Sequence, residues 1–153
     1  MKLQFRHQKF QSDTANAVCD VFAGQPFHAP TYMIDPGLGQ MDLDTIARWT
    51  GFNNAPVASG DEQVLEHIRV IQRAGQIKPS EKLEGRYNLT IEMETGVGKT
   101  YTYIKTMYEL NKRYGWSKFI IVVPSVAIRE GVYKSFQMTE EHFAEDYGKK
   151  IRY

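Results

Sequence analysis

The chain has 153 residues, of which 42% are hydrophobic and 24% are charged, a composition typical of one globular domain with its own core. Its 19 basic and 18 acidic residues leave a net charge of +1, which excludes a global attraction for nucleic acid but not a local basic patch. No stretch reaches the roughly 18 apolar residues of a membrane-spanning helix and the start lacks a signal peptide's apolar core, so we expect a cytoplasmic protein without a membrane partner.

The first half of the chain, residues 1–86, is predicted to be helical but interrupted. Residues 8–23 have the hydrophobic spacing of a helix. Cys19 lies within it as a small buried side chain, and because it is the only cysteine, an internal disulfide is excluded. Residues 25–60 carry repeated proline and glycine and are expected to be mostly loop, with one short helix at 42–50. A further helix is predicted to begin at the capping-box pattern Ser59–Glu62 and to end at Gly75.

The second half, residues 87–153, alternates between strand and helix patterns. Residues 88–93 are a strand candidate, and 100–114 have helical spacing. Residues 118–124 carry five consecutive apolar side chains, as expected of a strand buried on both faces. A helix is predicted from Val126, and a last short helix from Thr139. This order predicts an α/β fold with a parallel sheet, which is incomplete in this chain because two or three strands would leave an open edge.

A candidate phosphate-binding loop joins the first predicted strand to its helix. Its residues are Met93, Glu94, Thr95, Gly96, Val97, Gly98, Lys99 and Thr100. The last three match the end of the G-x-x-x-x-G-K-[ST] pattern. Gly96 and Gly98 allow the backbone to curl around an anion, and a helix that begins near Lys99 adds its positive end. The Lys99 ammonium can reach the β- and γ-phosphates, and the Thr100 hydroxyl can bind Mg²⁺.

Met93 stands where the general pattern has glycine. That position lies where the strand enters the loop, so a side chain there removes no phosphate ligand. The alternative reading is that this stretch is a flexible surface turn. The strand and helix patterns on either side favour ATP and Mg²⁺ binding, with Lys99 and Thr100 as the candidate catalytic residues.

The stretch "IEMETGVGKTYTYIKTMYELNKRYGWSKFIIVVPSVAIREGV" resembles the N-terminal motor region of the Res subunit of type III restriction enzymes. That family belongs to the superfamily 2 helicases, in which alanine or methionine commonly opens the loop, as Met93 does here. The resemblance implies a partial RecA-like P-loop NTPase domain over 87–153. It also implies a motor that moves on double-stranded DNA and cuts it, together with a partner modification methyltransferase (Mod) subunit.

The resemblance further assigns a DNA-contacting segment after the second strand. Its candidate residues are Pro124, Ser125, Val126 and Arg129. The Ser125 hydroxyl and the N–H groups of a new helix are suitable phosphate donors, and Arg129 follows one turn later. From the residues alone, the favoured reading is that Ser125 is a helix cap and Arg129 a solvated side chain, and the resemblance reverses this preference.

The start of the chain resembles the glutamine motif that reads adenine upstream of such loops. Gln11 is the better match and Gln8 the reserve. An amide offers one donor and one acceptor to adenine, and Phe10 could stack on the base. Without the resemblance, Gln11 would be a solvated residue and Phe10 a core residue.

Several parts of a working motor are not found in this sequence. No apolar strand ending in Asp-Glu follows Thr100 to hold Mg²⁺ and polarise water, and no second motor domain supplies an arginine finger. We therefore expect a truncated N-terminal fragment that does not hydrolyse ATP by itself. The alternatives are another superfamily 2 helicase or translocase without a nuclease, a non-enzymatic remnant and, less well supported, a small-molecule kinase.

Histidines and acidic pairs suggest no further site. His7, His28, His67 and His142 lie far apart in the sequence without ligand spacing, so a zinc site is not expected. The acidic residues at 140–146 are interpreted as the solvated face of a terminal helix. Packing on the sheet is expected for the tyrosines near the loop, Tyr101, Tyr103 and Tyr108.

Overall fold

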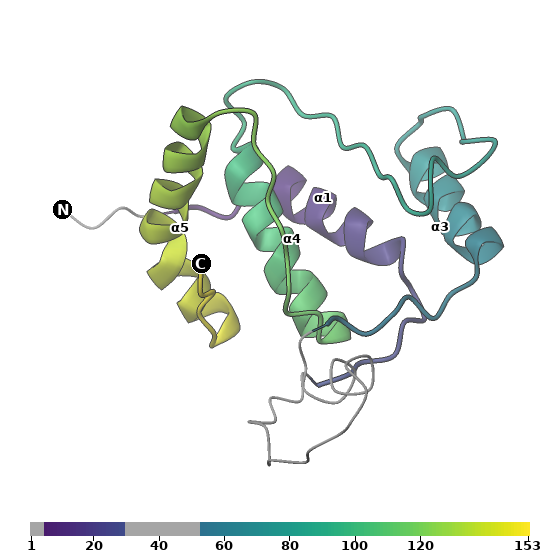
Figure 1. The fold of residues 1–153 in the computed structure, drawn as a ribbon. Helices are drawn as coiled ribbons and strands as arrows, with labels where there is room; N and C mark the ends of the chain where they lie inside the picture. The colour runs from purple at the N-terminus through teal and green to yellow at the C-terminus, as the bar shows by residue number, and fades with distance from the viewer. Residues whose placement is uncertain (1–4, 30–52) are drawn as a thin grey trace, which may run out of the picture.

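The computed structural model describes residues 5–29 and 53–153, and within these ranges the regular structure is entirely helical. Its helices are α1 (Lys9–Asp20), α3 (Asp61–Ala74), α4 (Lys99–Tyr114) and α5 (Val126–Tyr147). Helix α4 lies at the centre, with α1 and α5 packed against it, and α3 packs against α1 on the side away from α5 (Figure 1). Within the described ranges no helix is long and apolar enough to cross a membrane.

Three of the predicted helices agree with the structure to within a few residues. Helix α1 contains Cys19, which is fully buried as predicted. The capping-box prediction for α3 is wrong, because the N-cap is Gly60 and no side chain caps the helix. Asp61 and Glu62 lie in the first turn instead, where carboxylates interact favourably with the helix dipole. The helix predicted at 42–50 lies outside the described residues.

Helix α5 is one continuous element rather than the two helices predicted. It begins at Ser125, whose Oγ accepts a hydrogen bond from the N–H of Ile128 at 3.3 Å. It continues through Thr139, where a second helix was predicted to start; the Thr139 hydroxyl donates to the Ser135 carbonyl at 2.8 Å within the same helix. The helix ends at Gly148, which adopts a positive φ of 66°.

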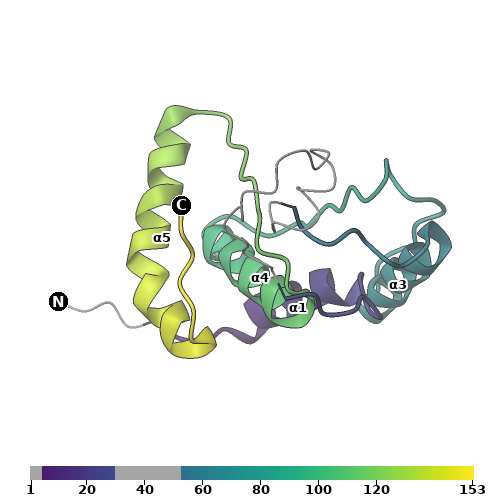
Figure 2. The ribbon, with the colours of Figure 1, turned by 60° about the horizontal axis from the view of Figure 1, so that its bottom comes forward.

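The predicted α/β fold with a parallel sheet is contradicted. Residues 88–93 and 118–123 run as irregular segments, and neither pairs as a strand within the described parts of the chain (Figures 1 and 2). A strand exists only when its N–H and C=O groups bond to a neighbour. Here the two segments stand on either side of a cavity of about 450 Å³ beside α4, so their backbones do not meet.

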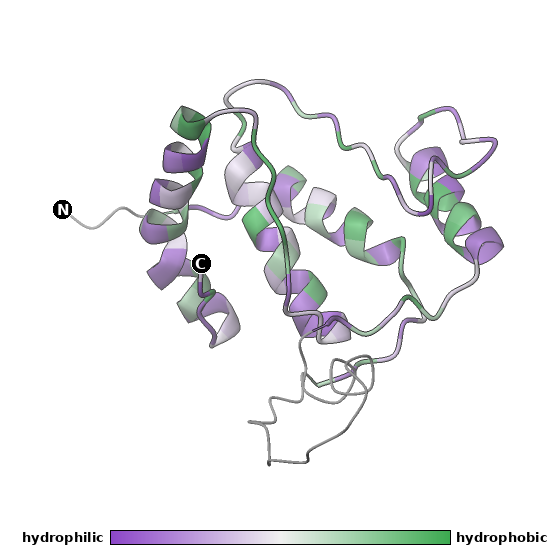
Figure 3. Cartoon of the chain, in the orientation of Figure 1, coloured by the Kyte–Doolittle hydropathy of each residue, from purple (hydrophilic) through white to green (hydrophobic). Residues whose placement is uncertain are grey.

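The apolar run at 118–123 accordingly lacks the burial that was expected of it. Ile120 and Val122 are 92% and 88% exposed, while Phe119 and Ile121 between them are about 40% exposed. Figure 3 shows hydrophobic residues along this connection between α4 and α5. The run was correctly identified as apolar, but hydrophobicity alone does not supply the neighbouring strands that would bury it.

Two hydrophobic clusters share α4. The first cluster joins α1, α3 and the C-terminal end of α4; its buried residues are Cys19, Val21, Phe22, Val64, Tyr114 and Trp116. The second cluster joins α4 to α5; its buried residues are Ile104, Met107, Tyr108, Phe136 and Phe143. The tyrosines therefore pack on helix α5 rather than on a sheet, with the Tyr101 and Tyr108 rings 4.9 and 5.0 Å from that of Phe143.

Polar contacts fix the loops around the first cluster. The buried Gln25 side chain donates to the Pro56 carbonyl at 3.1 Å and accepts from the Ala58 N–H at 2.7 Å. The Trp116 indole donates to the Ala55 carbonyl at 2.9 Å. Residues 55–58 are thereby held between the end of α1 and the end of α4.

Candidate functional site

The loop that was predicted to bind phosphate leads directly into α4. Gly96 and Gly98 both have positive φ angles, 83° and 86°, and Gly98 is the N-cap of the helix. Such angles are strained for residues with a side chain. The backbone path therefore requires glycine at both positions.

The start of α4 offers backbone donors to an anion. The first N–H groups of a helix have no partner within it. The first N–H to bond back is that of Thr102, which donates to the Gly98 carbonyl at 3.0 Å. The Thr102 hydroxyl donates to the same carbonyl at 3.1 Å, which fixes the turn. The N–H groups of Lys99 to Tyr101 thus carry the positive end of the helix dipole.

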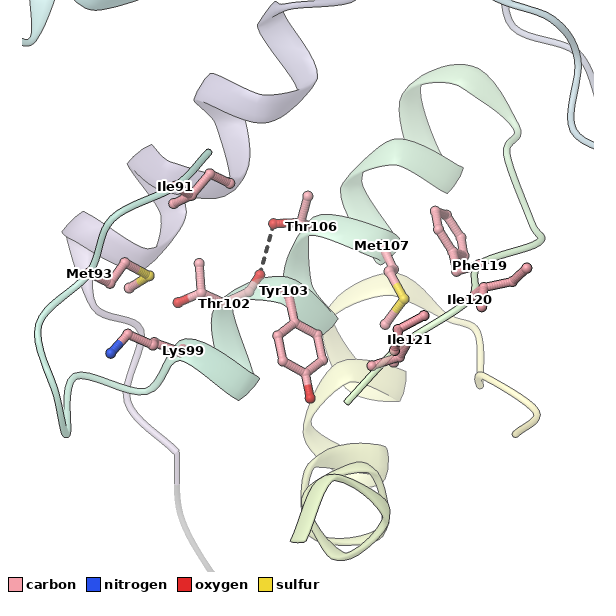
Figure 4. Close-up of a pocket in the computed structure, with 11 residues that line it drawn as sticks. Ile91, Met93, Lys99, Thr102, Tyr103, Thr106, Met107, Phe119, Ile120 and Ile121 are labelled. Atoms are coloured by element: carbon pink, nitrogen blue, oxygen red, sulfur yellow. Dashed lines mark hydrogen bonds between the residues drawn. The ribbon is translucent and has the colours of Figure 1, made fainter. Parts of the chain in front are cut away.

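Lys99 and Thr100 occupy the first two positions of α4. The Lys99 side chain is exposed and extends back toward the segment that carries Met93 (Figure 4). Thr100 is partly buried, and Glu94 and Thr95 are exposed. An ammonium group, a hydroxyl and free N–H groups thus surround one loop, and this donor set fits a triphosphate with Mg²⁺.

Gln11 lies against this loop, although more than eighty positions separate them in the sequence. Its side-chain amide donates to the Val97 carbonyl at 2.9 Å, and the residue is only 8% exposed. A Cβ at Gly98 would lie 2.6 Å from the Gln11 amide nitrogen, so the two residues are in close contact. The neighbouring Phe10 is 45% exposed and available to a ligand.

The loop also borders the apolar cavity beside α4. Lys99 and Thr102 lie at one end of it, and Tyr103 and Met107 line its helical wall (Figure 4). The Tyr103 hydroxyl is buried without a hydrogen-bond partner in the described structure. The cavity lining is not evident from the sequence; only the helical spacing of Thr102, Tyr103, Thr106 and Met107 on α4 indicates a shared face.

The segment that was predicted to contact DNA surrounds the start of α5. Pro124, Ser125, Val126 and Arg129 are all exposed. Ser125 acts as the helix cap through its 3.3 Å bond to Ile128. The guanidinium of Arg129 lies 3.1 Å from the carboxylate of Glu130 and its side chain is 68% exposed. A single exposed ion pair of this kind holds an arginine only weakly, so Arg129 is accessible to a phosphate.

Comparison with known proteins places the chain in a family. The family described as "Type III restriction enzyme, res subunit" matches residues 58–152. The EcoP15I Res subunit of Escherichia coli is 36% identical over 103 residues, which cover 65% of this chain and 11% of that protein. The EcoPI Res subunit of Escherichia phage P1 is 38% identical over 96 residues, 60% of this chain and 10% of that protein.

A third relative is the StyLTI Res subunit of Salmonella typhimurium, which is 42% identical over 69 residues, 44% of this chain and 7% of that protein. The chain therefore spans about a tenth of the length of the curated relatives it matches. All three relatives are Res subunits of type III restriction-modification enzymes. The family match covers more than half of the chain, and the chain belongs to the family of type III restriction enzyme Res subunits.

Proposed function

We propose that this chain is the ATP-binding region of a Res subunit whose motor moves along double-stranded DNA and cuts it. One observation carries the proposal: a loop with two left-handed glycines opens α4 at Lys99, and Gln11 of α1 is bonded to it. The glycine angles would let successive N–H groups of the loop point at one anion, and the Gln11 contact would hold the loop in place.

The residues of the loop have separate roles in this proposal. The N–H groups between Gly96 and Thr100 bind the phosphate oxygens, and the Lys99 ammonium binds the β- and γ-phosphates. The Thr100 hydroxyl holds Mg²⁺, and Gln11 with Phe10 recognises the adenine. Bound ATP supplies the free energy for movement on DNA. The bond from the Gln11 amide to the Val97 carbonyl supports a coupling between recognition of the base and the position of the loop.

DNA contact is proposed for the exposed start of α5. Ser125 and the first N–H groups of the helix would donate to a backbone phosphate, and Arg129 would add a positive charge one turn later. Such contacts position a protein on DNA without reading its sequence. We assign recognition of the DNA sequence to a partner methyltransferase subunit, and place the activity in the cytoplasm.

Titration with a fluorescent ATP analogue and Mg²⁺ tests the nucleotide site. Lys99→Ala is expected to weaken binding at least about tenfold, because a hydrogen bond to a charged group contributes about 1.5–3 kcal/mol. Lys82→Ala removes an exposed lysine from the connection before the loop and should leave the affinity unchanged. Equal affinities for Lys99→Ala and the unsubstituted chain would contradict the proposal.

A complete Res subunit that contains this sequence provides the functional test. Lys99→Ala should abolish ATP-dependent cleavage of DNA in the presence of the methyltransferase subunit, while Lys82→Ala should retain it. Cleavage that persists in Lys99→Ala would show that the loop does not drive the reaction.

A further inference from the structure

Three potential metal ligands from two distant parts of the chain meet beside α5. His7 precedes α1, and His142 and Asp146 lie near the end of α5. The His7 Nε2 atom is 3.5 Å from one carboxylate oxygen of Asp146, and the His142 Nε2 atom is 3.7 Å from the other. The ligand atoms of all three residues lie within 4.8 Å of one another.

Local structure explains why these residues converge. His142 and Asp146 are four positions apart, so they share one face of α5. His7 is brought to that face by aromatic packing, since the Phe5 ring lies 5.3 Å from that of His142 and 6.1 Å from that of Tyr101. The rings of the two histidines are 5.0 Å apart. The separation of the histidines in the sequence had argued against a zinc site, and the fold removes that objection.

The spacing suits a tetrahedral metal ion. Nitrogen and oxygen ligands bind Zn²⁺ at about 2.0–2.2 Å, so neighbouring ligands of a tetrahedral site lie roughly 3.4 Å apart. The two histidine-to-carboxylate distances, 3.5 and 3.7 Å, reach different oxygens of Asp146. With one ligand atom from each residue the three atoms lie within 4.8 Å of one another, so these side chains draw together when the ion binds. His142 and Asp146 are largely buried, with 13% and 26% of their side chains exposed, whereas His7 is 56% exposed.

We propose that His7, His142 and Asp146 bind one Zn²⁺ ion, which fastens the segment before α1 to α5. The Tyr101 hydroxyl, 2.8 Å from His142 Nε2, gives up that hydrogen bond when the metal binds and lies beside the fourth position. None of these ligands belongs to the proposed nucleotide site.

Equilibrium dialysis with Zn²⁺ and cobalt substitution test this site. The unsubstituted chain should bind one equivalent of Zn²⁺, show the visible absorption of tetrahedral Co²⁺ and gain thermal stability with added zinc. His142→Gln and His7→Gln should each weaken Zn²⁺ binding at least about tenfold, at the scale seen for altered metal sites. The matched control is His28→Gln, which replaces an exposed histidine outside the cluster and should leave Zn²⁺ affinity unchanged.

His7→Gln keeps the test decisive if His142→Gln fails to fold, because the His7 side chain is more than half exposed. Absence of stoichiometric zinc binding by the unsubstituted chain would overturn the proposal. Unchanged affinity in His7→Gln would overturn it as well. These measurements require no ATP. A negative result for the zinc site therefore leaves the proposed nucleotide site untouched, and a negative result for nucleotide binding leaves the zinc site untouched.

Discussion

At the residue scale, the two glycines of the loop are needed for different reasons. Both have positive φ angles, but a Cβ at Gly96 would meet nothing within 4 Å, whereas a Cβ at Gly98 would meet the Gln11 amide nitrogen at 2.6 Å. Gly96 is therefore required by backbone conformation alone. Gly98 is required by conformation, and a side chain there would also push the end of the Gln11 side chain away from its bond to Val97.

This difference predicts a specific pattern of stabilities. Gly96→Ala should destabilise the chain by about 1–2 kcal/mol through backbone strain alone. Gly98→Ala should cost more, because it also displaces Gln11 from its bond to Val97. In a Gln11→Ala background the two substitutions should have equal effects. Urea unfolding measures all of these free energies, and equal costs in the presence of Gln11 would refute the close contact.

Cys19 gives a second prediction at this scale. The residue is fully buried, and burial raises the pKa of its thiol from 9.0 to about 12, an effect that the nearby Arg113 opposes. The thiol therefore stays protonated when folded, and we expect no reaction with thiol reagents at neutral pH until the chain unfolds. Rapid reaction under native conditions would contradict the buried position.

The same shift predicts a pH dependence of stability. The Cys19 thiol has a higher pKa in the folded chain than in the unfolded chain. Its protonated form therefore contributes stability that is fully present below about pH 9, and this contribution is lost as the pH rises toward about 12. Urea unfolding across this range should show a steeper alkaline loss of stability for the unsubstituted chain than for Cys19→Ala. If the free energy of unfolding fell equally with pH in both chains, the Cys19 thiol would have the same pKa in the folded and unfolded states.

At the element scale, Ser125 has a structural role that must be separated from its proposed role on DNA. Its hydroxyl caps α5, so Ser125→Ala should destabilise the chain by about 1 kcal/mol. Ser125→Asp retains an N-cap oxygen and adds a negative charge. It should therefore keep the stability, measured by thermal unfolding, and weaken DNA binding, measured by fluorescence anisotropy. DNA affinity that is unchanged in Ser125→Asp would remove the proposed phosphate contact.

Helix α5 also shows how far an element can be predicted. Its start was correct because Ser125 and the preceding proline are local signals. Its continuation beyond Thr139 was missed because packing of Phe136 and Phe143 against α4 stabilises the helix over its whole length.

At the scale of the whole molecule, α4 joins two clusters that otherwise use different helices. Helix α1 is held against α4 by Arg113, whose guanidinium donates to the side chains of Asp20 and Asn16 at 2.7 and 2.6 Å. Helix α5 is held against α4 by the Tyr147 hydroxyl, which donates to the carboxylate of Glu109 at 2.7 Å. Arg113 also forms an ion pair with Glu109 at 3.5 Å, which connects the two anchors, but the hydrophobic clusters use different helices. We therefore expect the two sides of α4 to respond largely separately to mutations in the clusters.

Phe143→Ala tests this separation. The ring is fully buried between α4 and α5, and its removal should cost about 3–5 kcal/mol. Hydrogen exchange should show lost protection in α5 and retained protection in α1 and α3. Phe27→Ala removes an aromatic ring that is 55% exposed and should change little. Equal loss of protection in all helices would show that the two clusters unfold as one unit.

The sequence by itself determined the family, the position of the loop and most helix boundaries, because these depend on neighbouring residues: glycine angles, helix caps and hydrophobic spacing. Only the tertiary structure decided that residues 88–93 and 118–123 do not pair, that Gln11 bonds to the loop and that His7 meets His142 and Asp146. Each of these depends on contacts between distant segments, and the sequence pattern of a single segment contains no information about its partner in space.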